Sequence, residues 1–262
     1  MSLLELSGVE KRFGGIAAIQ GVSFRVEPKQ IFGLIGPNGA GKTTLFNVVT
    51  GVYRPEAGRV TFDGRDVTGK NPAAIAEAGL GRTFQNIRLF RAMSVEQNVM
   101  VAGQHLHRSG LFDALLRTRR FADDENRLRR RAHELLELMG LRELSAELAQ
   151  SLPYGSQRRL EIARALMLEP QLLLLDEPAA GMNSQEARDL ERQLRFLRDQ
   201  LGLSLILVEH NVSLVMSVCD HIHVVDRGRT IAEGVPDEIK THPRVLSAYL
   251  GEDSGDSGET ER

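Results

Sequence analysis

The chain has 262 residues, of which 42% are apolar, and its formal net charge is −2. This length suits one large domain or two small ones with a hydrophobic core, and the near-neutral charge argues against binding nucleic acid through the overall field. The single cysteine, Cys219, excludes an intramolecular disulfide, favours a reducing compartment and carries no sign of a catalytic thiol. With no signal peptide pattern and no run of 18 apolar residues, a role at a membrane would require a partner protein.

The chain combines two kinds of predicted strand. Three segments near the N-terminus have strand-forming compositions: residues 3–9, 22–26 and 58–63. The second of them alternates apolar and polar residues, which predicts half-buried strands in an antiparallel part. The run Ile31–Ile35 is continuously apolar instead, as is typical of a strand covered on both faces. Leu172–Leu175 and Leu203–Val208 share this character and follow helical stretches, so all three runs are expected in one parallel sheet with crossover helices.

A glycine-rich motif of the form G-x-x-x-x-G-K-T follows the strand Ile31–Ile35 and precedes a helix predicted to begin near Lys42. Its glycines allow a tight turn whose main-chain N–H groups form an anion nest, and the helix adds its positive N-terminal end. The Lys42 ammonium would reach the outer phosphates, and the Thr43 hydroxyl would bind Mg²⁺. The alternative is an ordinary glycine-rich turn. The motif predicts an ATP site formed by Gly36, Pro37, Asn38, Gly39, Ala40, Gly41, Lys42, Thr43 and Thr44.

Residues 86–150 contain few strand signals and many helix formers, which predicts a helical insert in the core. An apolar stripe at helical spacing ends at Gly140, a residue typical of helix C-termini: Leu128, Leu135, Leu136 and Met139. One P-loop and no internal repeat predict a single ATPase domain over 1–250. Within it, the core would comprise 1–85 and 156–250 and the insert about 86–155. Residues 251–262 are polar and acidic, which predicts a disordered tail.

The stretch Arg108–Arg131 holds eight arginines and four acids. It could form a patch that faces phosphate or lipid. A solvated helix face with ion pairs such as Glu125–Arg129 is the favoured interpretation.

Two adjacent acids, Asp176 and Glu177, end the apolar run Leu172–Leu175. The carboxyl ends of parallel strands form the edge of a sheet where ligands bind. Asp176 is suited to hold the Mg²⁺ shell, and Glu177 is suited to act as the general base that activates a water. The alternative is a strand boundary that happens to be acidic.

The segment Leu152–Arg164, between the P-loop and these acids, resembles the signature motif and helix of ATP-binding subunits of ABC transporters. The usual L-S-G-G-Q is altered: Pro153 replaces serine, Tyr154 replaces the first glycine, and Ser156 replaces glutamine. Pro153 can donate no hydrogen bond. The resemblance therefore implies that main-chain N–H groups at the start of a helix over 157–168 contact the γ-phosphate of the partner subunit's ATP, from Gly155, Ser156 and Gln157.

Four other residues stand in the family's order. Phe13 matches the aromatic residue that stacks on adenine, although a core phenylalanine is the alternative. Gln85 matches the Q-loop glutamine, which is expected to touch Mg²⁺ or the attacking water. Asn183 stands at the usual aspartate position of the D-loop. His210, at a strand end, matches the switch histidine that contacts the γ-phosphate.

The resemblance covers Leu3–Gly251 and is closer to the ATPase subunits of branched-chain amino acid importers, through segments such as residues 82–90 and 242–251. The family's architecture is α/β: a P-loop NTPase parallel sheet core with an antiparallel β subdomain and a helical insert. Its implied partners are a second ATPase subunit, two transmembrane permease subunits and, indirectly, an extracytoplasmic substrate-binding protein, with no nucleic acid. The implied location is peripheral, at the cytoplasmic face of the inner membrane.

An apolar cluster after Gln85 is expected either to be buried or to receive a permease helix: Ile87, Leu89, Phe90 and Met93. Other functions remain open at this point. They are a motor for another cargo, such as urea, amides or exported lipopolysaccharide, a soluble ABC ATPase of nucleic-acid metabolism, and a P-loop kinase.

Overall fold

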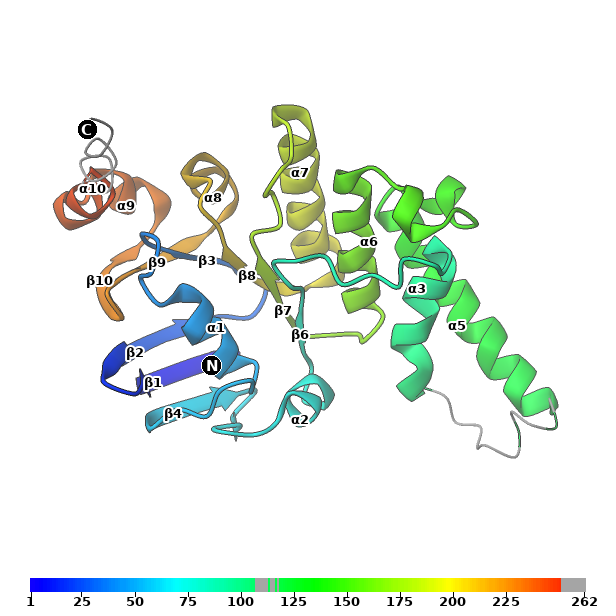
Figure 1. Cartoon of the computed structure of the whole chain (residues 1–262), viewed down its shortest axis with the longest axis horizontal. Helices are drawn as coiled ribbons and strands as arrows, with labels where there is room; N and C mark the ends of the chain where they lie inside the picture. Colours follow the sequence, from blue (N-terminus) through cyan, green and yellow to red (C-terminus); the bar gives the residue numbers. More distant parts are fainter. Residues whose placement is uncertain (107–112, 114–115, 117, 251–262) are drawn as a thin grey trace, which may run out of the picture.

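The computed structural model describes residues 1–250 except 107–112, 114–115 and 117. Figure 1 shows β-sheets toward one end of the molecule and a group of helices at the other. The last helix, α10 (Pro243–Leu250), lies on the β side, far from that helical end. The acidic segment 251–262, predicted to be disordered, lies outside the described residues.

The antiparallel part is a four-stranded sheet with the order β2-β1-β4-β5. Its strands are β1 (Leu4–Phe13), β2 (Ile16–Val26), β4 (Ala57–Phe62) and β5 (Arg65–Asp66). Strands β1 and β2 form a long hairpin that closes where Phe13 lies opposite Ile16. The sequence predicted only parts of this hairpin, because register shifts along it interrupt the alternation of apolar and polar residues.

The second sheet has six strands in the order β10-β9-β3-β8-β7-β6. All neighbouring pairs are parallel except β9 and β10. The strands are β3 (Ile31–Ile35), β6 (Leu80–Arg82), β7 (Leu172–Asp176), β8 (Ser204–Val208), β9 (His221–Asp226) and β10 (Arg229–Gly234). Strands β3, β7 and β8 are buried along their whole length, which confirms the prediction made from their continuous apolar runs.

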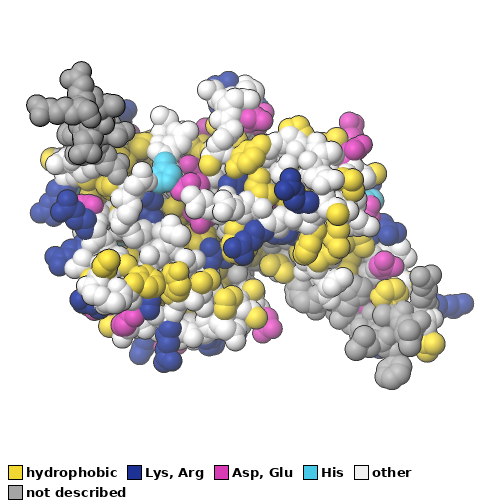
Figure 2. Space-filling view, viewed as in Figure 1, with side chains coloured by type: hydrophobic (Ala, Val, Ile, Leu, Met, Phe, Trp, Pro, Cys, Tyr) yellow, Lys and Arg dark blue, Asp and Glu magenta, His cyan; other side chains and the backbone are white. Residues whose placement is uncertain are grey.

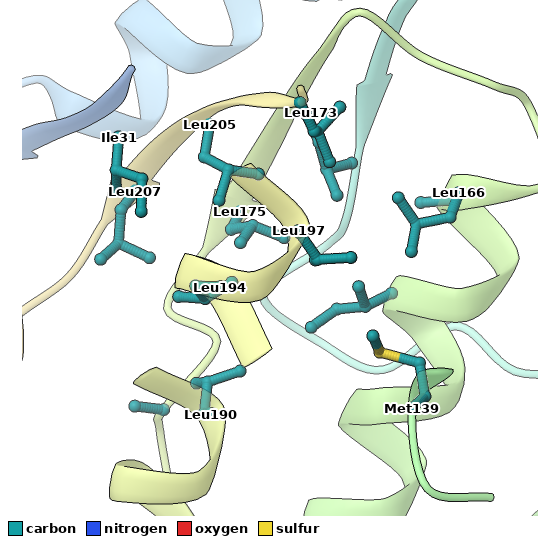
Figure 3. Packing of buried hydrophobic residues seen from close by; sticks show 14 of the residues in the cluster. Ile31, Met139, Leu166, Leu173, Leu175, Leu190, Leu194, Leu197, Leu205 and Leu207 are labelled. Carbon is teal, nitrogen blue, oxygen red and sulfur yellow. The ribbon is translucent and has the colours of Figure 1, made fainter. Parts of the chain in front are cut away.

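Both faces of the parallel sheet are covered. On one face, alternate strand residues meet the leucines of α7 (Ser184–Leu201), as Figure 3 shows for Ile31, Leu173, Leu175, Leu205, Leu207, Leu190, Leu194 and Leu197. The residues between them in the strands, such as Phe32 and Leu174, belong to a second buried cluster shared with the antiparallel sheet and with α1 (Lys42–Val49). Three shorter helices complete this part: α2 (Pro72–Glu77), α8 (Val212–Val218) and α9 (Pro236–Thr241).

The helical end is built from α3 (Val95–Ala102), α5 (Arg119–Leu138) and α6 (Tyr154–Leu166), with short 3₁₀ helices at Gly103–Leu106, Arg142–Leu144 and Ala149–Ser151. The predicted stripe of α5 is buried, and Gly140 follows the helix with a left-handed φ of 63°. Helix α6 packs against both α3 and α5. It begins at Tyr154, so the prediction of a start at Gln157 was wrong. Pro153 is the N-cap of α6. Proline has no N–H to donate, but this group has no helical partner at the start of a helix, so the helix can begin directly after the proline.

The described part of the basic stretch is a solvated helix face with ion pairs. Arg129 pairs with Glu96 of α3 at 2.8 Å, not with Glu125 as predicted, because α3 packs alongside α5. The Cys219 thiol is buried, and burial raises its pKa, which agrees with a structural role. Within residues 1–250, outside the gaps named above, no helix is long and apolar enough to cross a membrane.

Candidate active site

The P-loop lies between β3 and α1 and lines a pocket of about 550 Å³. Two of its glycines are required by space: a Cβ on Gly36 would overlap the carbonyl oxygen of Val225, and one on Gly41 would lie 2.6 Å from that of Ala18. Gly41 is also the N-cap of α1 with a φ of 103°, and no side chain caps this helix. The uncapped first turn of α1 therefore offers the N–H groups of Thr43 and Thr44 to an anion in the pocket.

The pocket brings the P-loop together with residues of β2 and with residues that follow β6, β7, β8 and β9. Its lining is Ile16, Ala17, Ala18, Gln20, Asn38, Gly39, Ala40, Gly41, Lys42, Thr43, Thr44, Gln85, Glu177, His210 and Arg227. The Lys42 ammonium is buried beneath the loop, where it donates to the carbonyl oxygen of Gly36 at 2.5 Å and to that of Pro37 at 2.9 Å. These bonds place a positive charge under the anion nest.

Glu177 stands at the centre of the predicted catalytic group. Its Oε2 accepts a hydrogen bond from Gln85 Nε2 at 3.1 Å, and its Oε1 lies 2.5 Å from His210 Nε2. The three residues come from the ends of β6, β7 and β8, which are neighbours in the sheet. Glu177 has a left-handed φ of 48°, and its main-chain N–H donates to the carbonyl oxygen of Val208 at 2.8 Å. The sheet edge therefore holds a carboxylate between an amide and an imidazole.

Asp176 is buried next to Glu177, and its Oδ1 has no hydrogen-bond partner among the described residues. Burial raises the pKa of Asp176, and the charge of Glu177 raises it further, against the opposing effect of Arg82. An orphaned carboxylate oxygen suits a hard cation such as Mg²⁺. The described residues hold no cluster of three or more His, Cys, Asp or Glu side chains able to bind a metal. Phosphate oxygens and water would have to complete the coordination.

Phe13 lies on the surface, with 43% of its area exposed, so the alternative of a core phenylalanine was wrong. Its ring meets the ring of Tyr53 edge to face at 5.1 Å, and the Lys11 ammonium lies 5.3 Å from its centre. The pocket lining begins at Ile16, across the turn of the hairpin from Phe13. Stacking on adenine therefore stays a prediction for an accessible ring at this turn.

The segment that resembles the signature motif lies outside the P-loop pocket. Its first helical residues are Tyr154, Gly155 and Ser156, whose N–H groups have no acceptor within the helix. The N–H of Gln157 instead donates to the carbonyl oxygen of Pro153 at 3.0 Å, so the expectation that this amide faces a phosphate was wrong. Helix α6 begins three residues earlier than predicted, and the set of free amides shifts by one residue, from 155–157 to 154–156.

Gly155 and Ser156 are buried within the chain. A Cβ on Gly155 would lie 2.8 Å from Oε1 of Glu186, and Ser156 Oγ accepts from Arg159 at 2.9 Å. Glu186 belongs to the start of α7, where Asn183 caps the helix: Asn183 Oδ1 accepts from the N–H of Glu186 at 3.0 Å and from that of Gln185 at 2.9 Å. Capping explains Asn183 locally, and its D-loop role stays a prediction.

Sequence reasoning missed a buried ion pair in α6. Arg158 and Glu161 are 3.2 Å apart, with side chains 3% and 2% exposed. Arg158 donates to the carbonyl oxygens of Phe84, at 2.7 Å, and Gln85, while the N–H of Phe84 donates to Glu161 at 3.2 Å. The helix that follows the signature segment thus holds the loop that carries Gln85. The only sequence signal was the i, i+3 spacing of Arg158 and Glu161 in a helix, and this spacing does not reveal that the pair binds the loop of Gln85.

Two further polar residues escaped the sequence analysis. The Arg82 guanidinium lies 4.6 Å from the ring centres of both Phe46 and Phe84 and donates to Thr50 Oγ1 at 2.7 Å, which ties β6 to helix α1. Burial lowers the pKa of Arg82. Glu209 is 3% exposed next to His210, and burial raises the pKa of its carboxyl. A lone acid before a histidine carries no recognisable pattern.

The apolar cluster after Gln85 is neither fully buried nor fully exposed. Phe90 is 48% exposed beneath the Arg164 guanidinium, and Leu89 packs partly into the core. A cavity of about 270 Å³ adjoins it, lined by Gln85, Asn86, Ile87, Leu89, Arg91, Ala149, Tyr154 and Gln157. Figure 2 shows hydrophobic side chains beside Lys and Arg side chains at the helical end of the molecule. Such a surface can receive an amphipathic helix.

Residues 19–180 match the family described as ABC transporter, and residues 229–254 match the family described as branched-chain amino acid ATP-binding cassette transporter. The chain belongs to the ABC transporter family. This ABC cassette is 46% identical over 251 residues to the high-affinity branched-chain amino acid transport ATP-binding protein BraF of Pseudomonas aeruginosa, covering 95% of this chain and 98% of BraF.

Two other relatives extend the comparison. The cassette is 43% identical over 250 residues to the corresponding protein LivG of Escherichia coli K12, with 95% and 98% of the chains covered. It is 37% identical over 253 residues to the lipopolysaccharide export system ATP-binding protein LptB of the same organism, with 97% and 99% covered. Among solved structures, the ADP conformation of MJ1267, an ATP-binding cassette of an ABC transporter, has a TM-score of 0.84 at 32% identity over 96% and 99% of the chains. The predicted α/β class is confirmed.

Proposed function

We propose that this cassette is the ATP-hydrolysing subunit of an importer of branched-chain amino acids, which pass through separate membrane permeases. The names of BraF and LivG and the match of residues 229–254 support this cargo. Export of lipopolysaccharide is the second candidate, because LptB is similar over nearly the same length. The observation that carries the ATPase proposal is the contact of Glu177 with both Gln85 and His210 at the P-loop pocket.

The reaction converts ATP and water to ADP and phosphate, and each of the site residues has a separate role in it. The P-loop amides and Lys42 hold the phosphates, and Glu177 accepts the proton of the attacking water. Gln85 and His210 orient that carboxylate and the water and stabilise charge on the γ-phosphate. Bound Mg²⁺ would neutralise phosphate charge, and Thr43, Gln85 and Asp176 are the residues that would hold it.

A complete site requires two subunits in this proposal. The free amides of Tyr154, Gly155 and Ser156 stand outside the P-loop pocket of their own chain. They would bind the γ-phosphate in the pocket of a second copy or a related subunit, with Asn183 of the D-loop at the same interface. ATP binding would close the pair, and hydrolysis would reopen it.

Motion of the pair would reach two permease subunits through the surface at Phe90, which adjoins the loop that carries Gln85. The cassette would then be peripheral, at the cytoplasmic face of the inner membrane, and an extracytoplasmic binding protein would act indirectly. Nucleic acid is not a partner in this proposal. Phe90→Asp is expected to keep the ATPase activity of the isolated subunit and to abolish copurification with the permeases. Leu201→Asp, at an equally exposed leucine on α7, is the control. A lowered melting temperature in Phe90→Asp alone would assign Phe90 to the core.

Glu177→Gln tests the catalytic proposal. Loss of a general base lowers the rate about 10²–10⁴-fold, while ATP binding through the P-loop persists. The variant should accumulate as an ATP-bound dimer in size exclusion. Glu169→Gln is a matched control, since Glu169 also has a left-handed φ, of 51°, but precedes β7 at the opposite edge of the sheet. Near-normal phosphate release by Glu177→Gln would refute the assignment.

A further inference from the structure

Glu209 is a buried carboxylate without a role in the proposed reaction. It directly follows β8 and is 3% exposed, whereas the next residue, His210, is exposed. A buried carboxylate is costly unless its oxygens accept hydrogen bonds. Both oxygens of Glu209 do so, and both donors are main-chain N–H groups.

The first bond joins Glu209 to the turn that carries Glu177. Glu209 Oε1 accepts from the N–H of Ala179 at 2.7 Å. In the same turn, the N–H of Ala180 donates to the carbonyl oxygen of Glu177 at 3.1 Å. Pairing of β7 with β8 ends at Asp176 opposite Val208. The Glu209 side chain therefore supplies a contact between the segments that follow these two strands, beyond their last paired residues.

The second bond joins the Glu209 side chain to the main chain just after His210. Glu209 Oε2 accepts from the N–H of Asn211 at 3.4 Å, and Asn211 in turn caps α8 by accepting from the N–H of Leu214 at 3.1 Å. The backbone on both sides of His210 is thus tied to one carboxylate. That carboxylate also holds the turn from which Glu177 reaches His210 Nε2.

We propose that Glu209 is a positioning residue that fixes the main chains of Glu177 and His210 relative to each other. It contacts no residue of the P-loop nest in the bonds above, so it acts on the geometry of the general base and not on the binding of ATP. This inference rests on the proposed roles of Glu177 and His210. A displacement of about 1 Å in a catalytic group can lower a rate about 10²-fold.

The experiment compares two substitutions at Glu209 by steady-state ATP hydrolysis. Glu209→Ala removes both acceptors and is expected to lower kcat about 10–10²-fold, with KM for ATP within about threefold of wild type. Glu209→Gln keeps an acceptor oxygen for the N–H of Ala179 and should recover most of kcat. A role in stability alone would not produce this pattern in protein that is folded at the assay temperature.

Asp220→Ala is the matched control. Asp220 Oδ2 accepts from the main-chain N–H of Ile31 at 2.8 Å, so it makes the same type of bond at the opposite end of the sheet. This variant is expected to lower the melting temperature without changing kcat. An equal fall of kcat in Asp220→Ala and Glu209→Ala would overturn the inference, as would a Gln variant as slow as the Ala variant.

Glu177→Gln, assayed in parallel, separates this inference from the proposed function. If Glu177→Gln is inactive and folded Glu209→Ala has a kcat within twofold of wild type, only the role of Glu209 fails. If Glu177→Gln keeps its activity, the proposed general base and the positioning role both fail.

Discussion

The P-loop edge and the start of α6 are the two regions proposed to bind the phosphates of ATP, and they differ in how many of the proposed site residues they bring together. At the P-loop edge, the β3–α1 loop and the ends of β6, β7 and β8 converge on one pocket, where Glu177 already contacts Gln85 and His210. At the start of α6, the free amides of Tyr154, Gly155 and Ser156 meet no P-loop of their own chain. This difference is what the proposed two-subunit site requires: one region already assembled within the chain, and a second region that would act on the ATP of a partner.

The two regions are nevertheless mechanically joined. Arg158 and Glu161, in the first turns of α6, bind the main chain at Phe84 and Gln85. A displacement of α6 would therefore shift the glutamine that holds Glu177. In the proposed dimer, occupation of one subunit's α6 by the partner's ATP would be sensed at the other half of the same chain.

Gly155→Asp is expected to have the largest effect on activity. It places a side chain and a negative charge where the free amides meet a phosphate in the proposed dimer. We expect almost complete loss of ATPase activity and of ATP-dependent dimerisation in size exclusion, while binding of ATP to the isolated subunit persists. The new side chain would also meet Glu186, since a Cβ on Gly155 lies 2.8 Å from its Oε1.

Glu186→Ala relieves that local contact and provides the control. If Gly155→Asp in the Glu186→Ala background dimerises like Glu186→Ala alone, the damage was local repulsion and this segment is not the second half of the site. Continued failure to dimerise in folded protein supports the comparison.

Arg158→Met tests the connection between the two regions. Breaking a buried ion pair costs about 3–5 kcal/mol of stability, because Glu161 would keep an uncompensated charge. Burial already raises the pKa of Glu161. Arg158→Met with Glu161→Leu should restore much of the melting temperature, since an apolar pair of similar volume can replace a buried ion pair. The double variant should still hydrolyse ATP slowly, because the bonds to Phe84 and Gln85 are absent. Normal hydrolysis by the double variant would show that the ion pair serves stability alone.

Phe13→Ala concerns the accessible rim of the P-loop edge. If the ring stacks on adenine, its loss should weaken ATP binding by about 1–3 kcal/mol. GTP should be hydrolysed as well, since stacking does not distinguish purines. Phe196→Ala is the control, because Phe196 is similarly exposed, at 47% against 43%, but lies on α7. An equal and small effect of both substitutions on the dissociation constant would remove Phe13 from the site.

Pro153→Ala is the smallest predicted change. Pro153 has no N–H, and its carbonyl oxygen, which accepts from Gln157, would remain after the substitution. ATPase activity should stay within about twofold of wild type if the main-chain amides of α6 provide the anion contact. A larger loss in a protein of unchanged melting temperature would give the proline ring a direct part in the interface.

The sequence by itself determined the parts of the molecule that depend on local chemistry. The P-loop followed from Gly36–Thr43 behind an apolar strand, and continuous apolar runs marked the buried strands β3, β7 and β8. The resemblance to ABC cassettes predicted roles for Gln85 and His210, because each matches a single position of the family's motifs. Such features are readable because a turn, an anion nest or a buried strand places demands on neighbouring residues in the chain.

Only the tertiary structure decided which of these residues meet. Gln85 is 92 residues from Glu177, and His210 is 33 residues from it, and they come together because β6, β7 and β8 are adjacent in the sheet. No local sequence pattern predicts the bonds of Arg158 to the Gln85 loop or the bond of Glu209 to Ala179. Contacts between distant segments depend on strand order and helix packing, so they are fixed by the burial of apolar faces over the whole chain and not by the residues that make them.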